Sequence, residues 1–177
     1  MAVINNYVDA NLVLGKLGSA ALVSGVTEFE AVQSWVVGAA DYTPSAPIYR
    51  VFKGIPSDAI ILSIGILNDA VAGVTAATVG IYDVLDFDGI GAVVNASLFN
   101  ASLSLAAGNA IASGWVEVLN AVAIANREKQ LWELAAQTQY PGAAGPKASA
   151  YDICLVCTGM TTNTANIAMK LKYIRGV

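Results

Sequence analysis

Hydrophobic and polar residues alternate along several short segments of the chain, and turn-forming residues separate these segments. In EFEAVQSWVV, Trp35 lies on an apolar side and Glu30 on a polar side. In the last segment, IAMKLKYI, Leu171 points inward when Lys170 and Lys172 point outward. A period of two residues indicates a half-buried β-strand. Further strand candidates are IYRVF, TVGIYDV, WVEVLNAVAIA and YDICLVCTG. Short strands separated by Gly, Pro, Asn and Asp are typical of an all-β sandwich or barrel.

The segment from Ala59 to Leu67 departs from this pattern, because both of its sides are apolar. Strict alternation places Ile60, Leu62, Ile64 and Ile66 on one side, and Ile61, Ser63, Gly65 and Leu67 on the other. An antiparallel sheet normally has one solvated face. The second face of this strand must therefore be covered by another layer of the same domain or by another protein chain.

One clear helix is predicted, in NREKQLWELAAQ from Asn126 to Gln137. Leu131, Leu134 and Trp132 form an apolar stripe at spacings of three and four, and Asn126 can cap the helix. The segment NASLFNASLSLAAGNAIASG mixes helical and strand spacing, so periodicity alone does not assign it. We interpret it as a helical turn followed by irregular or strand structure.

The first 27 residues form a separate unit in this interpretation. Asp9 and Lys16 are their only charged residues, and LGSAALVSG is small and flexible. We therefore divide the chain into an N-terminal arm, 1–27, and a β-sandwich domain, 28–177. An apolar arm is expected to lie on a neighbouring subunit, although an edge strand and loop of the same domain is an equal alternative. The expected interface residues are Val3, Ile4, Tyr7, Leu12, Leu14, Leu17, Leu22 and Trp132.

The composition supports an assembled protein. Hydrophobic residues make up 56% of the chain and charged residues 12%, against about a quarter in ordinary soluble domains. The longest uncharged run, Gly89 to Val116, is interrupted by Asn, Ser and Gly and does not resemble a membrane span. No positive charge precedes Lys16, so no secretory signal is expected. Low charge indicates that much of the surface is hidden in an assembly; the alternative is a monomer with a Ser, Thr and Asn surface.

The sequence offers little catalytic chemistry. It contains no histidine, which excludes serine triads and most zinc sites. Cys154 and Cys157 form a C-x-x-C, but a redox pair needs a helix N-terminus and these residues lie in a strand pattern. Three residues apart on a strand means opposite faces, so we interpret both as buried apolar cysteines. We expect neither an enzyme nor a cofactor.

Asp83, Asp86 and Asp88 begin like a calcium loop, with carboxylates at alternating positions. The pattern then fails, because Ile90 and Ser97 stand where further ligands belong. An acidic hairpin loop is the favoured interpretation. Nine basic residues against thirteen acidic ones argue against a nucleic-acid surface.

Most of the chain resembles a family of small structural proteins of tailed bacteriophages that decorate or cement the capsid. The segments that carry the resemblance are, in order, YRVFKGIPSDAIILSIGILNDAVAG, VGIYD, LWELA, YPG, YDICLVCTG and IAMKLKYI. The resemblance spans Tyr49 to Ile174. It implies an all-β protein with one short helix: a jelly-roll-like antiparallel β-sandwich with an extended N-terminal arm.

The resemblance also implies a function. Such a protein is made in the host cytoplasm and binds the outside of the mature head, stabilising contacts between capsomers. Its partners are the major capsid protein and itself, as a dimer or trimer, with no nucleic acid and no membrane. One face of Ala59 to Leu67 would then pack in the sandwich core, and the other against the helix at Asn126 to Gln137 or a neighbouring subunit. The alternative is a binding module on the virion surface, in a head fibre, a tail or a host-glycan adhesin.

Overall fold

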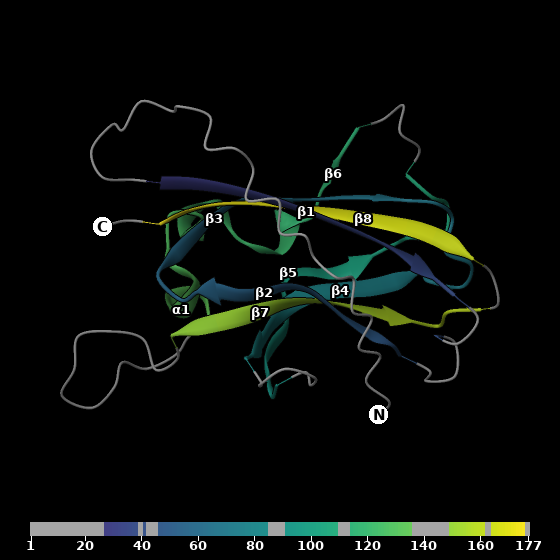
Figure 1. Ribbon diagram of the computed structural model, residues 1–177, viewed down its shortest axis with the longest axis horizontal. Helices are drawn as coiled ribbons and strands as arrows, with labels where there is room; N and C mark the ends of the chain where they lie inside the picture. Colours follow the sequence, from purple (N-terminus) through teal and green to yellow (C-terminus); the bar gives the residue numbers. More distant parts are fainter. Residues whose placement is uncertain are drawn as a thin grey trace.

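Eight strands form two four-stranded antiparallel sheets that pack face to face (Figure 1). The computed structural model describes residues 27–38, 41, 46–84, 91–109, 114–135, 149–161 and 164–175. The first sheet has the order β1 (Thr27–Val37), β8 (Ala165–Arg175), β3 (Ala59–Asn68), β6 (Val116–Glu117). The second has the order β2 (Ile48–Pro56), β7 (Ala150–Thr158), β4 (Ala76–Asp83), β5 (Val93–Leu103).

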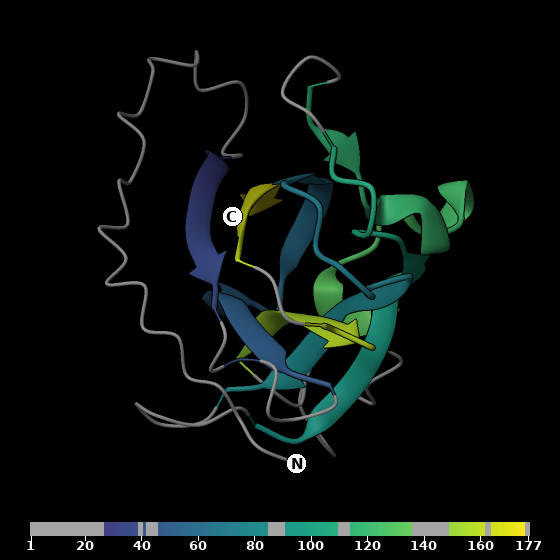
Figure 2. The same ribbon diagram turned by 90° about the vertical axis from the view of Figure 1, so that its right-hand side faces the viewer.

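The strand pairing follows a simple rule: the first strand pairs with the last, and the pairs continue inward along the chain. β1 pairs with β8, β2 with β7, β3 with β6 and β4 with β5. The chain is thus a long hairpin with its tip at β4 and β5, rolled up so that alternate pairs fall in opposite sheets (Figure 2). Eight strands wound in this way form a jelly roll. The expected all-β sandwich is confirmed.

The core lies between the two sheets, where alternate side chains of each strand point inward. The first sheet contributes residues such as Ile64, Ile66, Met169 and Leu171, and the second Val79, Ile81, Ile153 and Leu155, all of them fully buried. No helix of the described residues is long and apolar enough to cross a membrane.

β3 changes faces at a bulge. Leu62 has no partner in the register with β8, so β3 has an extra residue at this point. As a result Ile61 and Ile64, which strict alternation places on opposite sides, are both buried in the core, while Leu62 is 40% exposed. The prediction that Ile60, Leu62, Ile64 and Ile66 share one side was wrong, because a bulge reverses the alternation beyond it.

The helix expected to begin at Asn126 begins instead at Leu131. α1 is Leu131–Leu134, and Asn126 ends a 3-10 turn, η4 (Ile124–Asn126). Gln130 is extended, with ψ 154°, so the preceding turn does not continue into the helix. The backbone N of Gln130 donates to Glu133 Oε2 at 2.9 Å, as in a capping box. The prediction of Asn126 as the cap was therefore wrong.

The segment WVEVLNAVAIA, expected as one strand, is mostly irregular. Only β6 is extended, and a 3-10 turn, η3 (Leu119–Ala121), follows it. The carboxylate of Glu117 explains the break: its Oε1 accepts from the backbone N of Ile64 and from that of Leu119, each at 3.2 Å. The side chain thus turns the chain away from β3 directly after it has paired.

Candidate interaction surface

The outer side of the first sheet carries exposed apolar side chains on β1 and β3, the two strands that flank β8. We call this surface the outer face; it consists of the outward residues of β1, β8 and β3, which are Glu28, Glu30, Val32, Ser34, Val36, Asn166, Ala168, Lys170, Lys172, Ile174, Ile60, Leu62, Ser63, Gly65 and Leu67. Val32 is 51% exposed, Val36 53% and Leu62 40%. Aliphatic side chains at positions of a strand that normally face water indicate a surface for contact.

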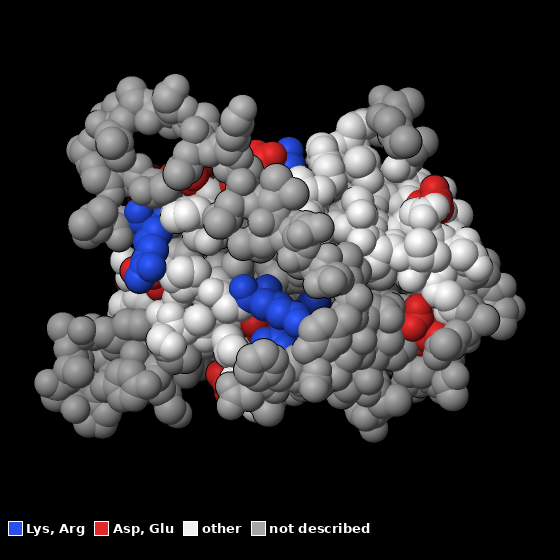
Figure 3. All heavy atoms as spheres, in the orientation of Figure 1, with Lys and Arg blue, Asp and Glu red and all other residues white. Residues whose placement is uncertain are grey.

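The charges on the outer face are largely neutralised within the chain. Lys172 Nζ lies 2.5 Å from Glu28 Oε1, and this hydrogen bond and charge raise the pKa of Lys172. The Nζ of Lys170 lies 5.2 Å from the centre of the Trp115 ring, within the range of a cation–π contact. Figure 3, in the orientation of Figure 1, shows the charged atoms of the described residues on this side of the molecule as a few separate groups. The outer face is therefore more apolar in character than its four charged residues suggest.

Trp115 covers part of the second face of β3, the strand that is apolar on both sides. A Cβ added to Gly65 would lie 3.0 Å from the Cβ of Trp115 and 3.3 Å from its ring, so the indole packs directly on the β3 backbone. Gly65 supplies the space that this contact needs. A glycine inside a strand often marks such a close approach, and it was the signal in the sequence that could have located the cover.

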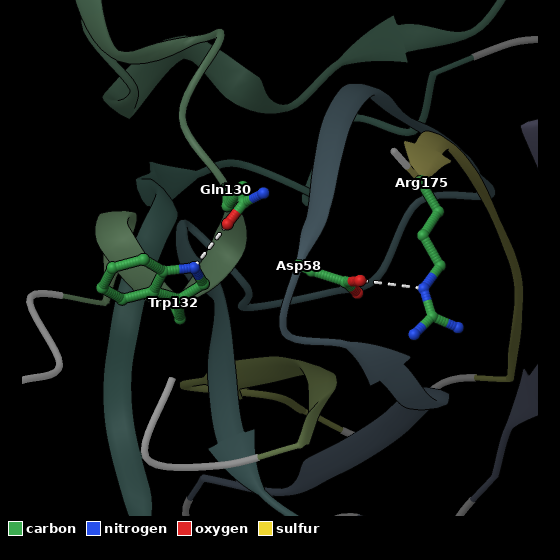
Figure 4. A network of polar contacts seen from close by, with 4 residues as sticks. All are labelled: Asp58, Gln130, Trp132 and Arg175. Carbon is green, nitrogen blue, oxygen red and sulfur yellow. Dashed lines mark hydrogen bonds and ion pairs between the residues drawn. The ribbon is translucent and has the colours of Figure 1, made fainter. Parts of the chain in front are cut away.

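α1 lies elsewhere. Figure 4 shows Trp132 beside Gln130, with the ion pair of Asp58 and Arg175 close to them. The Nε1 of Trp132 donates to Gln130 Oε1 at 2.6 Å, and its backbone N donates to the Ser57 carbonyl at 3.0 Å, in the turn between β2 and β3. Trp132 is half-buried against the core and closes one end of the sandwich. The expectation that the helix covers the second face of β3 was therefore wrong at Gly65, where Trp115 lies.

The other expected interface residues fall in the arm. Val3, Ile4, Tyr7, Leu12, Leu14, Leu17 and Leu22 all lie outside the described residues. Sequence reasoning missed Val32 and Val36, although both occupy positions of EFEAVQSWVV where the alternation calls for polar residues. That departure from the pattern was the available signal.

A hollow of about 330 Å³ lies at one end of the outer face. Its polar edge is built on Asp69, whose Oδ2 accepts from the backbone N of Asn166 at 3.0 Å and from its Nδ2 at 2.6 Å. These hydrogen bonds hold the pKa of Asp69 below its usual value, so the edge is anionic. The lining residues are Ser34, Trp35, Val36, Leu67, Asn68, Asp69, Asn109, Asn166, Ile167 and Ala168.

The outer side of the second sheet is different, because part of it is buried. Arg50 of β2 and Asp152 of β7 form an ion pair, Nε to Oδ2 at 2.5 Å, with side chains 8% and 0% exposed. The other carboxylate oxygen of Asp152 accepts from the backbone N of Gly54 at 2.8 Å. Tyr82 and Cys154 are also buried on this side, with Ala96 of β5 packed on them. Sequence reasoning missed this pair.

The two cysteines occupy opposite faces of β7, as predicted. Cys157 belongs to the main core, whereas Cys154 belongs to the cluster on the outer side. Both are free and fully buried. Burial raises the pKa of Cys157 to about 12 and raises that of Cys154 as well, where the charge of Asp152 adds to the effect. The thiols are therefore protonated at neutral pH.

The acidic loop can be placed only in part. Asp83 ends β4, and its backbone N donates to the Ala92 carbonyl at 2.9 Å. Asp86 and Asp88 lie outside the described residues. Within the part of the chain that the structure describes, no three His, Cys, Asp or Glu residues gather where they could hold a metal ion.

Comparisons with known proteins give a similarity in structure. No family model matches the chain, and no curated protein does either. Among solved structures, the chain is similar to a chain in the structure described as the cyanophage Pam1 capsid asymmetric unit. The two share 12% sequence identity with a TM-score of 0.44, over 85% of this chain and 84% of that chain.

Proposed function

We propose that this chain is a structural protein of a bacteriophage particle, one that decorates or cements the capsid. In this role it binds the outside of the mature head and stabilises contacts between capsomers. The resemblance of its phrases to decoration proteins suggests this class. The observation that carries the proposal is the outer face, where β1 exposes Val32 and Val36 and β3 exposes Leu62.

The outer face suits a protein partner for two reasons. Three of its four charges are paired or stacked within the chain, which reduces the desolvation of unpaired charge that opposes contact. The strands that carry it also form the core, so the surface is rigid and loses little entropy on binding. The jelly roll is shared by viral capsid domains and lectins, and it presents broad sheet faces of this kind.

A cement protein would act by mass action. It binds the mature lattice and not the disassembled one, so its binding free energy adds to the stability of the shell. An interface of standard size buries about 800 Å² on each partner. At about 25 cal/mol per Å², that gives a gross gain of up to about 20 kcal/mol per copy, which the costs of association reduce. Many copies acting together stabilise the shell further.

The test uses one substitution on the outer face and one away from it. Leu62→Glu places a charge on the outer face at a residue that is 40% exposed, while Ile124→Glu does the same in η4 at a residue that is 87% exposed. Purified protein is mixed with mature capsids of its phage, and capsid-bound protein is measured after sedimentation. We expect the wild type and Ile124→Glu to bind and to raise the temperature at which capsids rupture, and Leu62→Glu to lose both effects. Absence of binding by the wild type would refute the proposal.

A second candidate function, a binding module on the virion surface, is favoured by the hollow at Asp69. Its apolar floor and its Asp and Asn edge suit the hydroxyl groups of a host glycan, and lectins share the jelly roll. Asp69→Ala should abolish retention on host-cell glycans under this alternative and leave capsid binding intact. The same variant would behave like the wild type in both assays if the hollow has no ligand.

A further inference from the structure

The sandwich has four edge strands, and three of them are protected against pairing with another chain. β6 and β1 are the edges of the first sheet, and β2 and β5 are those of the second. An exposed edge presents a row of unpaired N–H and C=O groups, which proteins usually block with short strands, bulges, Lys or Pro. β6 has two residues, β2 has two register shifts together with Lys53 and Pro56, and β5 has three register shifts.

β1 has none of these devices. Its eleven residues pair with β8 in one unbroken register from Thr27 to Val37. It contains no Pro, Lys or Arg, and its inward positions carry no charge. No other strand of the described residues pairs with its second edge. Val32 and Val36, both about half exposed, lie on the outward side of this edge strand.

We propose that β1 is an interaction surface for a second copy of this chain. The two β1 strands pair antiparallel across a two-fold axis and join the two first sheets into one eight-stranded sheet. The proposal does not depend on capsid binding, because it concerns the purified chain alone. A strand pair buries less area than a standard interface, so we expect a dimer whose formation depends on protein concentration.

The charges on β1 select the antiparallel orientation. Glu28 and Glu30 occupy one end of the outward side and Ser34 and Val36 the other. A parallel pair would place each glutamate opposite its own copy, and like charges directly opposite are destabilising. The antiparallel pair places Glu28 opposite the second copy's Val36, and Glu30 opposite its Ser34.

Full overlap of the strands fixes the register. Val32 is the midpoint of Thr27–Val37, so pairing every residue places Val32 opposite the second copy's Val32. Directly opposed Cα atoms in an antiparallel pair are about 4.5 to 5.5 Å apart, which is within the range of a disulfide. In this register Val36 lies opposite the second copy's Glu28. The second copy's Val36 is eight residues further along that strand, so the two Val36 residues would be about 27 Å apart.

Two cysteine variants of the full chain test this geometry. Val32→Cys and Val36→Cys place a thiol on the same side of the same strand, at residues that are 51% and 53% exposed. After mild oxidation, the mass of each variant is measured without reductant; the wild type is the background, because Cys154 and Cys157 are fully buried. We expect Val32→Cys to form a covalent dimer of twice 18.2 kDa, and Val36→Cys to remain at background. Equal crosslinking of both variants, or crosslinking of Val36→Cys alone, would overturn the proposal.

A pair of lysine variants gives an independent reading by sedimentation of the folded protein. Val32→Lys places two lysines opposite each other and should give a monomer at every concentration. Val36→Lys places a lysine opposite Glu28 of the partner subunit and should retain the dimer. A wild type that stays monomeric at all concentrations, or a dimer that Val32→Lys leaves intact, would refute β1 pairing.

Discussion

The buried ion pair of the second sheet gives the sharpest test of how this fold is held together. Arg50 and Asp152 lie 2.5 Å apart with side chains 8% and 0% exposed. The first sheet offers a matched control, since Lys172 and Glu28 are also 2.5 Å apart but are 36% and 46% exposed. Changing each carboxylate to its amide, Asp152→Asn and Glu28→Gln, removes one charge with almost no change in volume. The two variants therefore differ mainly in burial.

The expected effects differ because water screens one pair and not the other. Asp152→Asn leaves the Arg50 guanidinium in a buried site without its counter-ion, which should lower the free energy of unfolding by about 3 to 5 kcal/mol. That is a large part of the roughly 5 to 15 kcal/mol that holds a domain together. Glu28→Gln leaves the exposed Lys172 solvated, so the unfolding midpoint should be almost unchanged.

The assay is urea unfolding followed by tryptophan fluorescence and far-UV circular dichroism, with two further variants: Arg50→Met alone, and Arg50→Met together with Asp152→Asn, which removes both charges. Arg50→Met combined with Asp152→Asn eliminates the stranded guanidinium, so the double variant should be more stable than the sum of the two single changes predicts. Equal midpoints for Asp152→Asn and Glu28→Gln would refute the argument from burial. Additive single changes would show that the two residues do not act as a pair.

Four further predictions concern packing and ionisation. Gly80→Ala should destabilise the fold by about 3 kcal/mol or more in urea unfolding, because its Cβ would lie 2.1 Å from a backbone oxygen of β5. Trp132→Ala should cost about 3 kcal/mol, the low end of the range for a large aromatic in a core, since Trp132 is only half-buried; a change near zero would mean that α1 is peripheral. Cys154 and Cys157 should resist iodoacetamide at neutral pH until the protein unfolds. Burial raises the pKa of Cys157 from 9.0, and that of Tyr82 from 10.0, to about 12. The stability that these two groups contribute in their protonated form should be complete below about pH 9 and lost as the pH rises to about 12. Unfolding curves at several pH values measure this loss.

The local alternation of residues was enough to predict most of the strands. β8 follows a period of two in residue type, and the burial of β1 alternates in the same way although Val32 and Val36 are apolar. The opposite placement of Cys154 and Cys157 follows from their spacing alone. These features need no information from elsewhere in the chain. The jelly-roll expectation came from the resemblance, and the strand pairing agrees with it.

Several of the errors depend on contacts between distant segments. The bulge at Leu62 is set by the register with β8, which a local pattern does not contain. The side chain that packs on Gly65 of β3 is Trp115, which directly precedes β6 and is distant in the sequence. The ion pair left a signal that was not used: Arg50 and Asp152 are single charges within the apolar strand patterns IYRVF and YDICLVC, and a buried charge requires a partner.

The two sheets differ in how much of their outer sides is buried. The second sheet buries part of its outer side, around the ion pair of Arg50 and Asp152, and so has buried residues on both of its faces. The first sheet contributes its inner face to the core and leaves Val32, Val36 and Leu62 exposed on the other. Because these three side chains are half exposed, replacing them should cost little stability, which is why they are suitable sites for testing binding. If the outer face and the β1 edge are contact surfaces, changes there should affect assembly at unchanged unfolding midpoints, whereas changes at Arg50 or Asp152 should affect both together.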